Sequence, residues 1–189
     1  MSSLSSLSSK RICFVGAGAM AEAVIRGLIE TGRTARDQVA AVNHQNRARL
    51  GELKQKYGIR VAESPAERTE AIRDADIVVL AMKPKDAGAA LAEIGPLISK
   101  EQLVVSVIAG LSIRAIAAAL PAGAPIARTM PNTSSSIGCG ATGISFSPHV
   151  TEQQREEALD MFRSIGVVAR VEEPMLDLIT GLSGSGPAY

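Results

Sequence analysis

The glycine-rich segment over residues 16–21 is the part of the sequence best suited to bind a ligand. Its sequence, GAGAMA, directly follows a β-branched run over residues 11–15 and opens a helical pattern over 19–31. A strand, a glycine turn and a helix in this order form the dinucleotide-binding fingerprint, here with Ala21 in the third place. Gly16 allows the tight turn, and Gly18 lets the backbone approach a pyrophosphate at the positive end of the helix. We expect a nucleotide to bind here; the alternative is an ordinary glycine-rich turn.

The end of the second predicted strand, residues 38–43, indicates which nucleotide binds. Sites for NAD place Asp or Glu at this position, where the carboxylate accepts a hydrogen bond from the ribose 2′-hydroxyl. This sequence has Asn43 instead, followed by His44, Asn46, Arg47 and Arg49. No carboxylate repels a 2′-phosphate, and guanidinium groups are available to bind one. We therefore predict NADP(H) as the cofactor, with NAD(H) as the alternative. Arg47 and Arg49 have the competing interpretation of a solvent-exposed helix face.

Two further polar residues follow predicted strands. Lys83 comes after the strand over 75–82, and Asn132 follows the strand over 125–129. Ligands bind outside the carboxyl ends of strands in parallel sheets. Lys83 is a candidate to contact ribose or substrate, or else faces solvent, and Asn132 is a candidate to bond a carboxamide, or else belongs to a turn. No Ser-His-Asp or Cys-His arrangement is readable, so the catalytic residues stay unknown.

Short β-branched runs alternate with helical patterns along the chain. Strands are predicted at 11–15, 38–43, 59–61, 75–82, 103–108, 125–129, 141–145 and 166–171, and helices at 19–31, 47–57, 65–73, 151–164 and 175–182, after Pro84 and after Ser112. This alternation predicts an α/β fold with a doubly wound, mostly parallel Rossmann-like sheet and helices on both faces. We expect a disordered Ser-rich tail over 1–10 and a dinucleotide-binding domain over 11–172.

Composition narrows the classes of partner. The 189 residues carry a net charge of +1 and only 3% aromatic residues, which argues against nucleic acid and anionic membranes. Apolar runs fall far short of a bilayer span. Two cysteines without a CxxC pair favour free thiols in a reducing cytoplasm, and two isolated histidines give no metal site. We therefore expect a cytoplasmic protein that binds neither nucleic acid nor a membrane.

Four sequence blocks resemble the pyrroline-5-carboxylate reductase family. They are GAGAMAEAVIRGL at 16–28, VVLAMKP at 78–84, RTMPNTSSSIGCGATG at 128–143 and LDLITGLSGSGPAY at 176–189, and the similarity runs in order from residue 11 to 189. The resemblance implies an oxidoreductase in which NADPH reduces the C=N bond of 1-pyrroline-5-carboxylate to L-proline, the last step of proline biosynthesis. Ala19 and Met82 depart mildly from the family, which commonly has Asn or Ser and Val at these places.

The same resemblance implies site residues and a domain organisation. It places Ser185 and Gly186 near the substrate carboxylate, and it assigns cofactor contacts to Ala17, Gly18, Ala19, Met20, Asn43, Ala81, Lys83, Pro84 and Asn132. Residues 173–189 would begin a helical domain that dimerises and completes the active site. We accordingly expect the full-length protein to be a homo-oligomer built on dimers, and the 189-residue chain to be monomeric and inactive alone. The alternatives are another NADP-dependent imine or β-hydroxyacid reductase, or a non-catalytic NADP-binding module.

Overall fold

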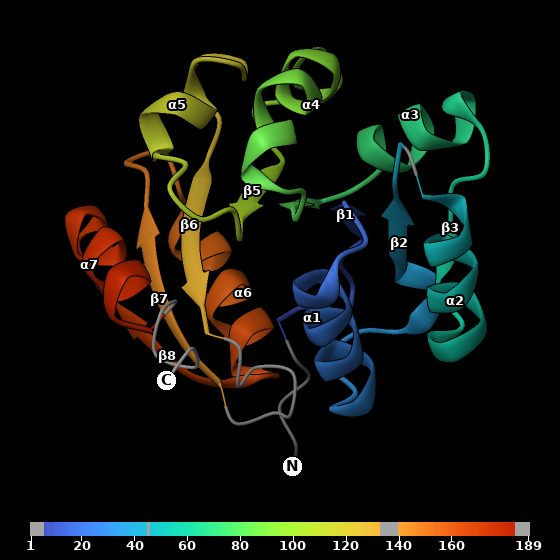
Figure 1. Cartoon of the computed structure of the whole chain (residues 1–189), viewed down its shortest axis with the longest axis horizontal. Helices are drawn as coiled ribbons and strands as arrows, with labels where there is room; N and C mark the ends of the chain where they lie inside the picture. Colours follow the sequence, from blue (N-terminus) through green and yellow to red (C-terminus); the bar gives the residue numbers. More distant parts are fainter. Residues whose placement is uncertain (1–5, 45, 133–139, 184–189) are drawn as a thin grey trace.

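The computed structural model describes residues 6–44, 46–132 and 140–183, and it contains an eight-stranded sheet (Figure 1). The strands lie in the order β3-β2-β1-β4-β5-β6-β7-β8. Their bounds are β1 (Ile12–Val15), β2 (Val39–Val42), β3 (Arg60–Val61), β4 (Ile77–Leu80), β5 (Leu103–Ser106), β6 (Ile126–Pro131), β7 (Gly140–Phe146) and β8 (Gly166–Arg170). The predicted α/β fold with a mostly parallel, Rossmann-like sheet is confirmed.

The central strands are apolar on both faces, as a sheet covered by helices on both sides requires. β1 reads ICFV, β4 reads IVVL and β5 reads LVVS, and every residue of the three is buried. β1 lies between β2 and β4 with Ile12 opposite both Val39 and Ile77. Because corresponding residues of β2, β1 and β4 lie opposite one another, these three strands end at the same edge of the sheet.

One pair of strands, β6 and β7, is antiparallel, and the other pairs are parallel. Residues 132–139 alone separate the two strands along the chain. A parallel pair needs a crossover of about a dozen residues or more. The short connection therefore reverses the direction of the chain, and the helix α6 (Glu152–Arg163) then restores a parallel crossover into β8.

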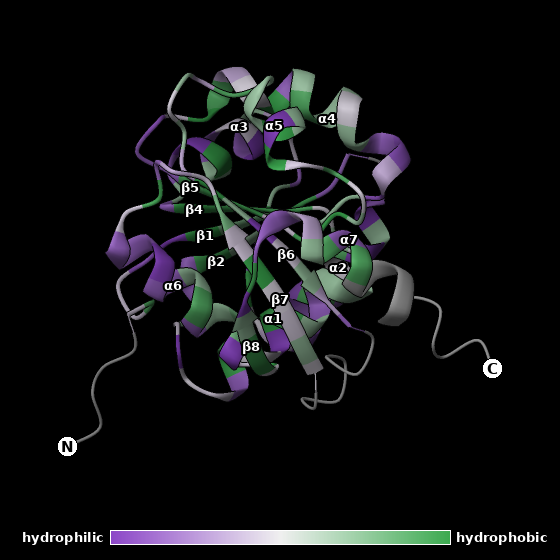
Figure 2. Ribbon diagram, turned by 90° about the vertical axis from the view of Figure 1, so that its left-hand side faces the viewer, coloured by the Kyte–Doolittle hydropathy of each residue, from purple (hydrophilic) through white to green (hydrophobic). Residues whose placement is uncertain are grey.

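Helices cover both faces of the sheet (Figure 2). One apolar core joins the sheet to α1 (Ala19–Glu30), α2 (Arg47–Tyr57) and α6, and a second core lies under α3 (Pro65–Arg73), α4 (Ala87–Ile94) and α5 (Ile113–Ala117). Short 3-10 turns span Arg36–Gln38, Pro84–Asp86 and Gly95–Leu97. Within the described residues, no helix has both the length and the apolar character of a membrane span.

Local sequence signals explain where these helices begin and end. Ser64 caps α3 by accepting a hydrogen bond from the N–H of Glu67 at 3.2 Å, and the Glu67 carboxylate accepts from the N–H of Ser64 at 3.0 Å. Gly58 ends α2 with φ at 70°. These signals give α2 and α3 the predicted bounds, whereas β4 is shorter than the predicted 75–82 because residues 81 and 82 turn into the loop beyond the sheet.

The start of α7 (Glu173–Ser183) is bound to β6 by a buried arginine. The Arg128 guanidinium is 4% exposed and contacts Glu173 at 3.0 Å and Asp177 at 2.5 Å. Glu173 also accepts from the N–H of Ile113 at 2.7 Å. This half of α7 therefore packs on the same body as the sheet, and the predicted domain boundary at residue 172 stays a prediction.

Residues 6–10 differ from the predicted disordered tail over 1–10. Leu7 is fully buried in the core beneath α1 and α6. Lys10 bonds the Glu157 carboxylate at 3.1 Å, and that carboxylate is only 2% exposed. The burial of Leu7 and the ion pair between Lys10 and Glu157 hold this segment against the rest of the fold. The high serine content of the segment indicated neither contact.

We predict that Leu7→Ala lowers the free energy of unfolding by about 2–4 kcal/mol, because it leaves a cavity in a packed core. Urea unfolding followed by circular dichroism measures the change, with Ser8→Ala as the control at a neighbouring exposed position. A Leu7 variant as stable as the control would show that the segment contributes nothing to the fold.

Candidate functional site

The turn after β1 fits tightly against the turn after β4. Gly16 has φ at +110°, and its N–H donates to the carbonyl of Val42 at 2.9 Å. A Cβ atom at Gly16 would lie 2.6 Å from the carbonyl carbon and oxygen of Ala81. No other residue type fits without moving the backbone. The predicted tight turn at Gly16 is therefore present, and the Ala81 backbone is its immediate neighbour.

Gly18 lies two residues further on and faces open space. A Cβ atom there would find one atom within 4 Å, the carbonyl oxygen of Ala81 at 4.0 Å. Gly18 is the N-cap of α1 and makes no side-chain capping bond, and Glu22 donates the first intrahelical bond to the Gly18 carbonyl at 3.0 Å. The N–H groups of the first helical turn, from Ala19 onward, therefore have no carbonyl partner within the helix. Together with the helix dipole they form a cradle suited to an anion.

This cradle opens into a cleft of about 400 Å³ at the carboxyl edge of the sheet. Six residues of the predicted cofactor set line it together: Gly16, Ala17, Gly18, Asn43, Ala81 and Lys83. Ala19 and Met20 lie beside it in the first turn of α1, and Pro84 opens the 3-10 turn that follows Lys83. The sheet topology thus brings three separate loops of the predicted site to one place.

The cleft also contains Asn46 and Arg49, which follow Asn43 in the sequence, together with three residues that were not predicted: Met82, Lys85 and Asp86. Lys85 and Asp86 belong to the same turn as Pro84. Their position next to the Ala81–Pro84 block was a signal that they face the same cleft. The two lysines of this loop place cationic groups near the anion cradle, with Asp86 as the opposing charge.

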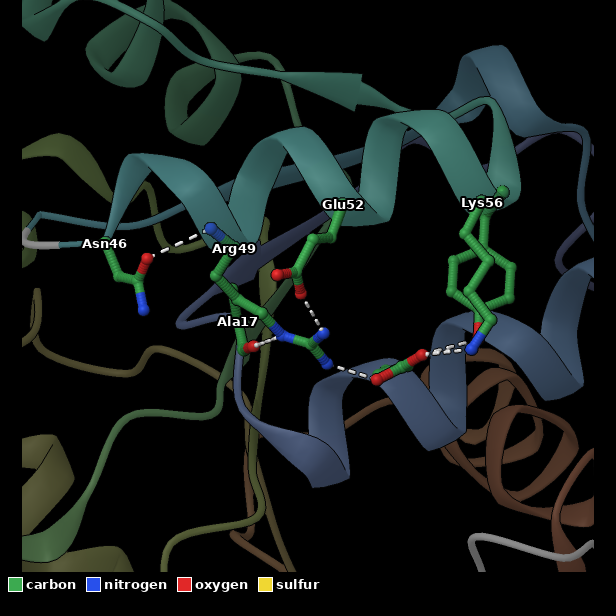
Figure 3. Close-up of polar contacts among 7 residues, drawn as sticks. Ala17, Asn46, Arg49, Glu52 and Lys56 are labelled. Carbon is green, nitrogen blue, oxygen red and sulfur yellow. Dashed lines mark hydrogen bonds and ion pairs between the residues drawn. The ribbon is translucent and has the colours of Figure 1, made fainter.

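Arg49 holds the glycine turn in place (Figure 3). Its Nε donates to the carbonyl of Ala17 at 3.0 Å, and its Nη atoms pair with Glu22 of α1 and with Glu52. Asn46 caps α2 by accepting from the N–H of Arg49 at 3.0 Å. The guanidinium therefore contacts the glycine turn and two carboxylates, whereas the alternative interpretation placed it on a solvent-exposed helix face. A contact between Arg49 and a 2′-phosphate stays a prediction.

Glu22 is the centre of a polar cluster that joins α1 to α2. Its carboxylate accepts from Lys56 at 2.8 Å and from the Tyr57 hydroxyl at 2.8 Å, in addition to Arg49. The hydrogen bond from Lys56, with those from Tyr57 and Arg49, lowers the pKa of Glu22 to about 2. The carboxylate thus stays charged at any physiological pH.

Asn43 lies where the main cleft meets two smaller hollows. Its Oδ1 accepts from the N–H of Asn46 at 3.4 Å. A slot of about 120 Å³ extends from it between Val42 and Met82, and a hollow of about 230 Å³ lies beside Arg47. Asn43 therefore occupies the junction expected of the residue that follows β2 in a dinucleotide site. Arg47 is exposed and borders the outer hollow, not the main cleft.

The remaining predicted residues lie elsewhere. Asn132 continues the ladder of β6 and β7, because its N–H donates to the Ala141 carbonyl at 3.1 Å and its Oδ1 accepts from the Ala141 N–H at 3.2 Å. Its contact with a carboxamide stays a prediction. Ser185 and Gly186 lie outside the described residues. Across the described ranges no group of His, Cys, Asp or Glu could hold a metal ion. Burial raises the pKa of Cys13 to about 12, so this thiol stays protonated.

The chain is similar to known reductases over nearly its whole length. A family model described as "NADP oxidoreductase coenzyme F420-dependent" matches residues 11–110. Pyrroline-5-carboxylate reductase 1 of Bacillus spizizenii is 40% identical over 180 residues, which are 95% of this chain and 60% of the relative. This chain thus spans about three fifths of the length of that curated relative.

Solved structures agree with this similarity. A pyrroline-5-carboxylate reductase from Coxiella burnetii has a TM-score of 0.87 and 33% identity, over 96% of this chain and 66% of that one. The Plasmodium falciparum pyrroline carboxylate reductase, solved with NADP bound, has a TM-score of 0.82 and 25% identity, over 96% of this chain and 64% of that one. The three loops described above therefore lie in a domain whose relatives include an NADP-bound protein.

We predict that Glu22→Gln lowers the free energy of unfolding by about 2 kcal/mol at pH 7, because a folded-state pKa of about 2 means that the charged form is stabilised. The pKa is below its unfolded value, so this stabilisation is complete above about pH 4.5 and is lost as the pH falls toward 2. Urea unfolding of both proteins between pH 7 and pH 2.5 should show the two free energies converging.

Glu52→Gln is the matched control, since Glu52 bonds the same Arg49 but is 63% exposed. It should cost less than about 0.5 kcal/mol at any pH, as surface pairs do. A Glu22→Gln difference that is independent of pH would mean that the carboxylate charge is not its source.

Proposed function

The chain belongs to the pyrroline-5-carboxylate reductase family and to the NADP oxidoreductase family whose model matches residues 11–110, and we propose that it binds NADPH as the cofactor-binding part of such a reductase. The observation that carries the proposal is the open cradle at Gly18. The backbone there leaves room for a pyrophosphate, and the first turn of α1 directs N–H groups toward it. A side chain at this position would fill the space that the phosphates need.

The lining residues fit a dinucleotide with a 2′-phosphate. Ala17 to Met20 would hold the pyrophosphate, and Ala81, Lys83 and Pro84 would lie along the ribose and nicotinamide half. Asn43 takes the place at the end of β2 where a carboxylate would repel a 2′-phosphate. NADPH is therefore the proposed cofactor, and NADH is the alternative that a titration separates.

The proposed reaction reduces the C=N bond of 1-pyrroline-5-carboxylate to give L-proline. NADPH would supply the hydride, and the residues of this chain would bind the dinucleotide and orient its nicotinamide toward the substrate. An imine that arrives protonated needs no strong general acid from the protein. Ser185 and Gly186 are the proposed substrate-side residues.

The organisation of the longer protein is part of the same proposal. The match covers 60% of the B. spizizenii relative, so about two fifths of that protein lie outside it. We propose that such a region, starting at residues 173–189, completes the substrate pocket and forms dimers, and that the enzyme acts in the cytoplasm on a small molecule.

We expect Gly18→Val to abolish most NADPH binding while the fold is kept. Valine fits the backbone at this position, since φ is −74° and the nearest atom to a Cβ is 4.0 Å away, but its methyl groups enter the pyrophosphate space. Calorimetric titration with NADPH measures the loss. The control is Gly51→Val, because Gly51 is exposed on α2 with nothing within 4 Å of its Cβ position. Equal affinity of the two variants would contradict the assignment of the cradle.

We also expect the 189-residue chain to bind NADPH but to oxidise it with 1-pyrroline-5-carboxylate at least about 100-fold more slowly than a full-length relative, since an unheld imine forfeits near-attack geometry. The assay follows NADPH absorbance for both proteins at matched concentrations, with their sizes checked by light scattering. Comparable turnover would place the catalytic groups within residues 1–189, with Lys83 and Asn132 as the first candidates to mutate.

A further inference from the structure

A second arginine reaches the Asn43 end of the site from an element outside the glycine fingerprint. Arg68 lies on α3 and borders both the slot between Val42 and Met82 and the outer hollow beside Arg47. Its side chain is 21% exposed, and its Nη2 is paired with the Glu93 carboxylate of α4. The guanidinium is therefore held at the boundary between the two hollows instead of extending into solvent.

The charges around the outer hollow favour an anion. Arg47 from α2 and Arg68 from α3 border it from two different helices, and Asn43 and His44 also line it. Glu63 also lines the hollow, and its carboxylate pairs with Lys54 at 3.3 Å. The nearby Glu67 carboxylate accepts from the N–H groups of Glu63 and Ser64. Arg47 has no ion-pair partner within the part of the chain that the structure describes. Two guanidinium groups thus converge where the nearby acids are engaged by other groups.

We propose that Arg68 is a specificity-determining residue that, together with Arg47, binds the 2′-phosphate of NADPH across this hollow. The inference rests on the proposed function, because it assumes that the adenosine end of the cofactor lies at Asn43. A guanidinium has five donors in a planar fork that matches a phosphate, and the contact with Glu93 uses one of its Nη groups. Glu93 thereby acts as a tether that orients the fork rather than as its only partner.

The contact between Arg68 and Glu93 has a simpler interpretation, in which it only joins α3 to α4. A partly exposed ion pair of this kind contributes little to stability. The two interpretations make different predictions for the cofactor. A bridge between helices affects NADPH and NADH alike, whereas a phosphate ligand affects only the dinucleotide that carries the 2′-phosphate.

The test titrates the 189-residue chain and its variants with NADPH and with NADH by calorimetry. We expect Arg68→Ala to weaken NADPH binding about tenfold or more and to change NADH binding less than twofold. Arg68→Lys keeps the charge but not the fork, so it should give an intermediate loss for NADPH. Arg73→Ala is the matched control, because it removes the same charge from an exposed position at the other end of α3 and should leave both affinities unchanged.

Three outcomes would overturn the role of Arg68: equal losses for both dinucleotides, no loss for either, or the same NADPH loss in Arg73→Ala. Equal losses would mean that Arg68 maintains the shape of the slot and does not contact the 2′-phosphate. If Arg68→Ala does not fold, as judged by circular dichroism, the Arg68→Lys result decides by the same criteria. A parent chain that binds neither dinucleotide would instead refute the proposed function itself, so the two failures are distinguishable.

Discussion

The close contact between Gly16 and the backbone of Ala81 is the constraint on which the candidate site depends. β1 and β4 are neighbours in register, so the chain leaves both strands at the same height and the two turns meet. A Cβ atom at Gly16 would overlap the Ala81 carbonyl group, and the missing side chain is what lets the turns lie against each other. The cleft then forms above this contact, with Gly18 on one side and Lys83 on the other.

The cluster around Glu22 stabilises the same arrangement from outside the sheet. Arg49 joins the Ala17 carbonyl to the Glu22 carboxylate, so a single guanidinium connects the glycine turn, α1 and α2. Lys56 and Tyr57 bind the same carboxylate about two turns further along α2. The orientation of α2 sets where Asn43 and Arg47 stand, because both lie in the segment that enters this helix. The geometry of the adenosine end is thereby coupled to the geometry of the phosphate cradle.

A buried charge on β6 determines where α7 packs. Arg128 is a buried residue of β6, and a guanidinium in such a place needs carboxylate partners, since an unpaired buried charge is strongly unfavourable. Glu173 and Asp177, one turn apart on α7, supply them. Residues near the end of the chain are thus attached to the dinucleotide-binding body through β6, next to the strand end that carries Asn132.

The sequence by itself determined the elements and the position of the nucleotide cradle. The uninterrupted apolar runs of β1, β4 and β5, the caps at Ser64 and Gly58 and the strand-glycine-helix order are local features, and local backbone and burial preferences suffice to read them. The tertiary structure decided the rest, because it depends on which loops meet. Periodicity could not show that Arg49 turns toward Ala17, that Leu7 enters the core or that Arg68 of α3 reaches the hollow beside Arg47. Arg49 is 32 positions from Ala17, and Arg68 is 21 positions from Arg47. Such separations close only when the sheet order brings the strand ends and helices together.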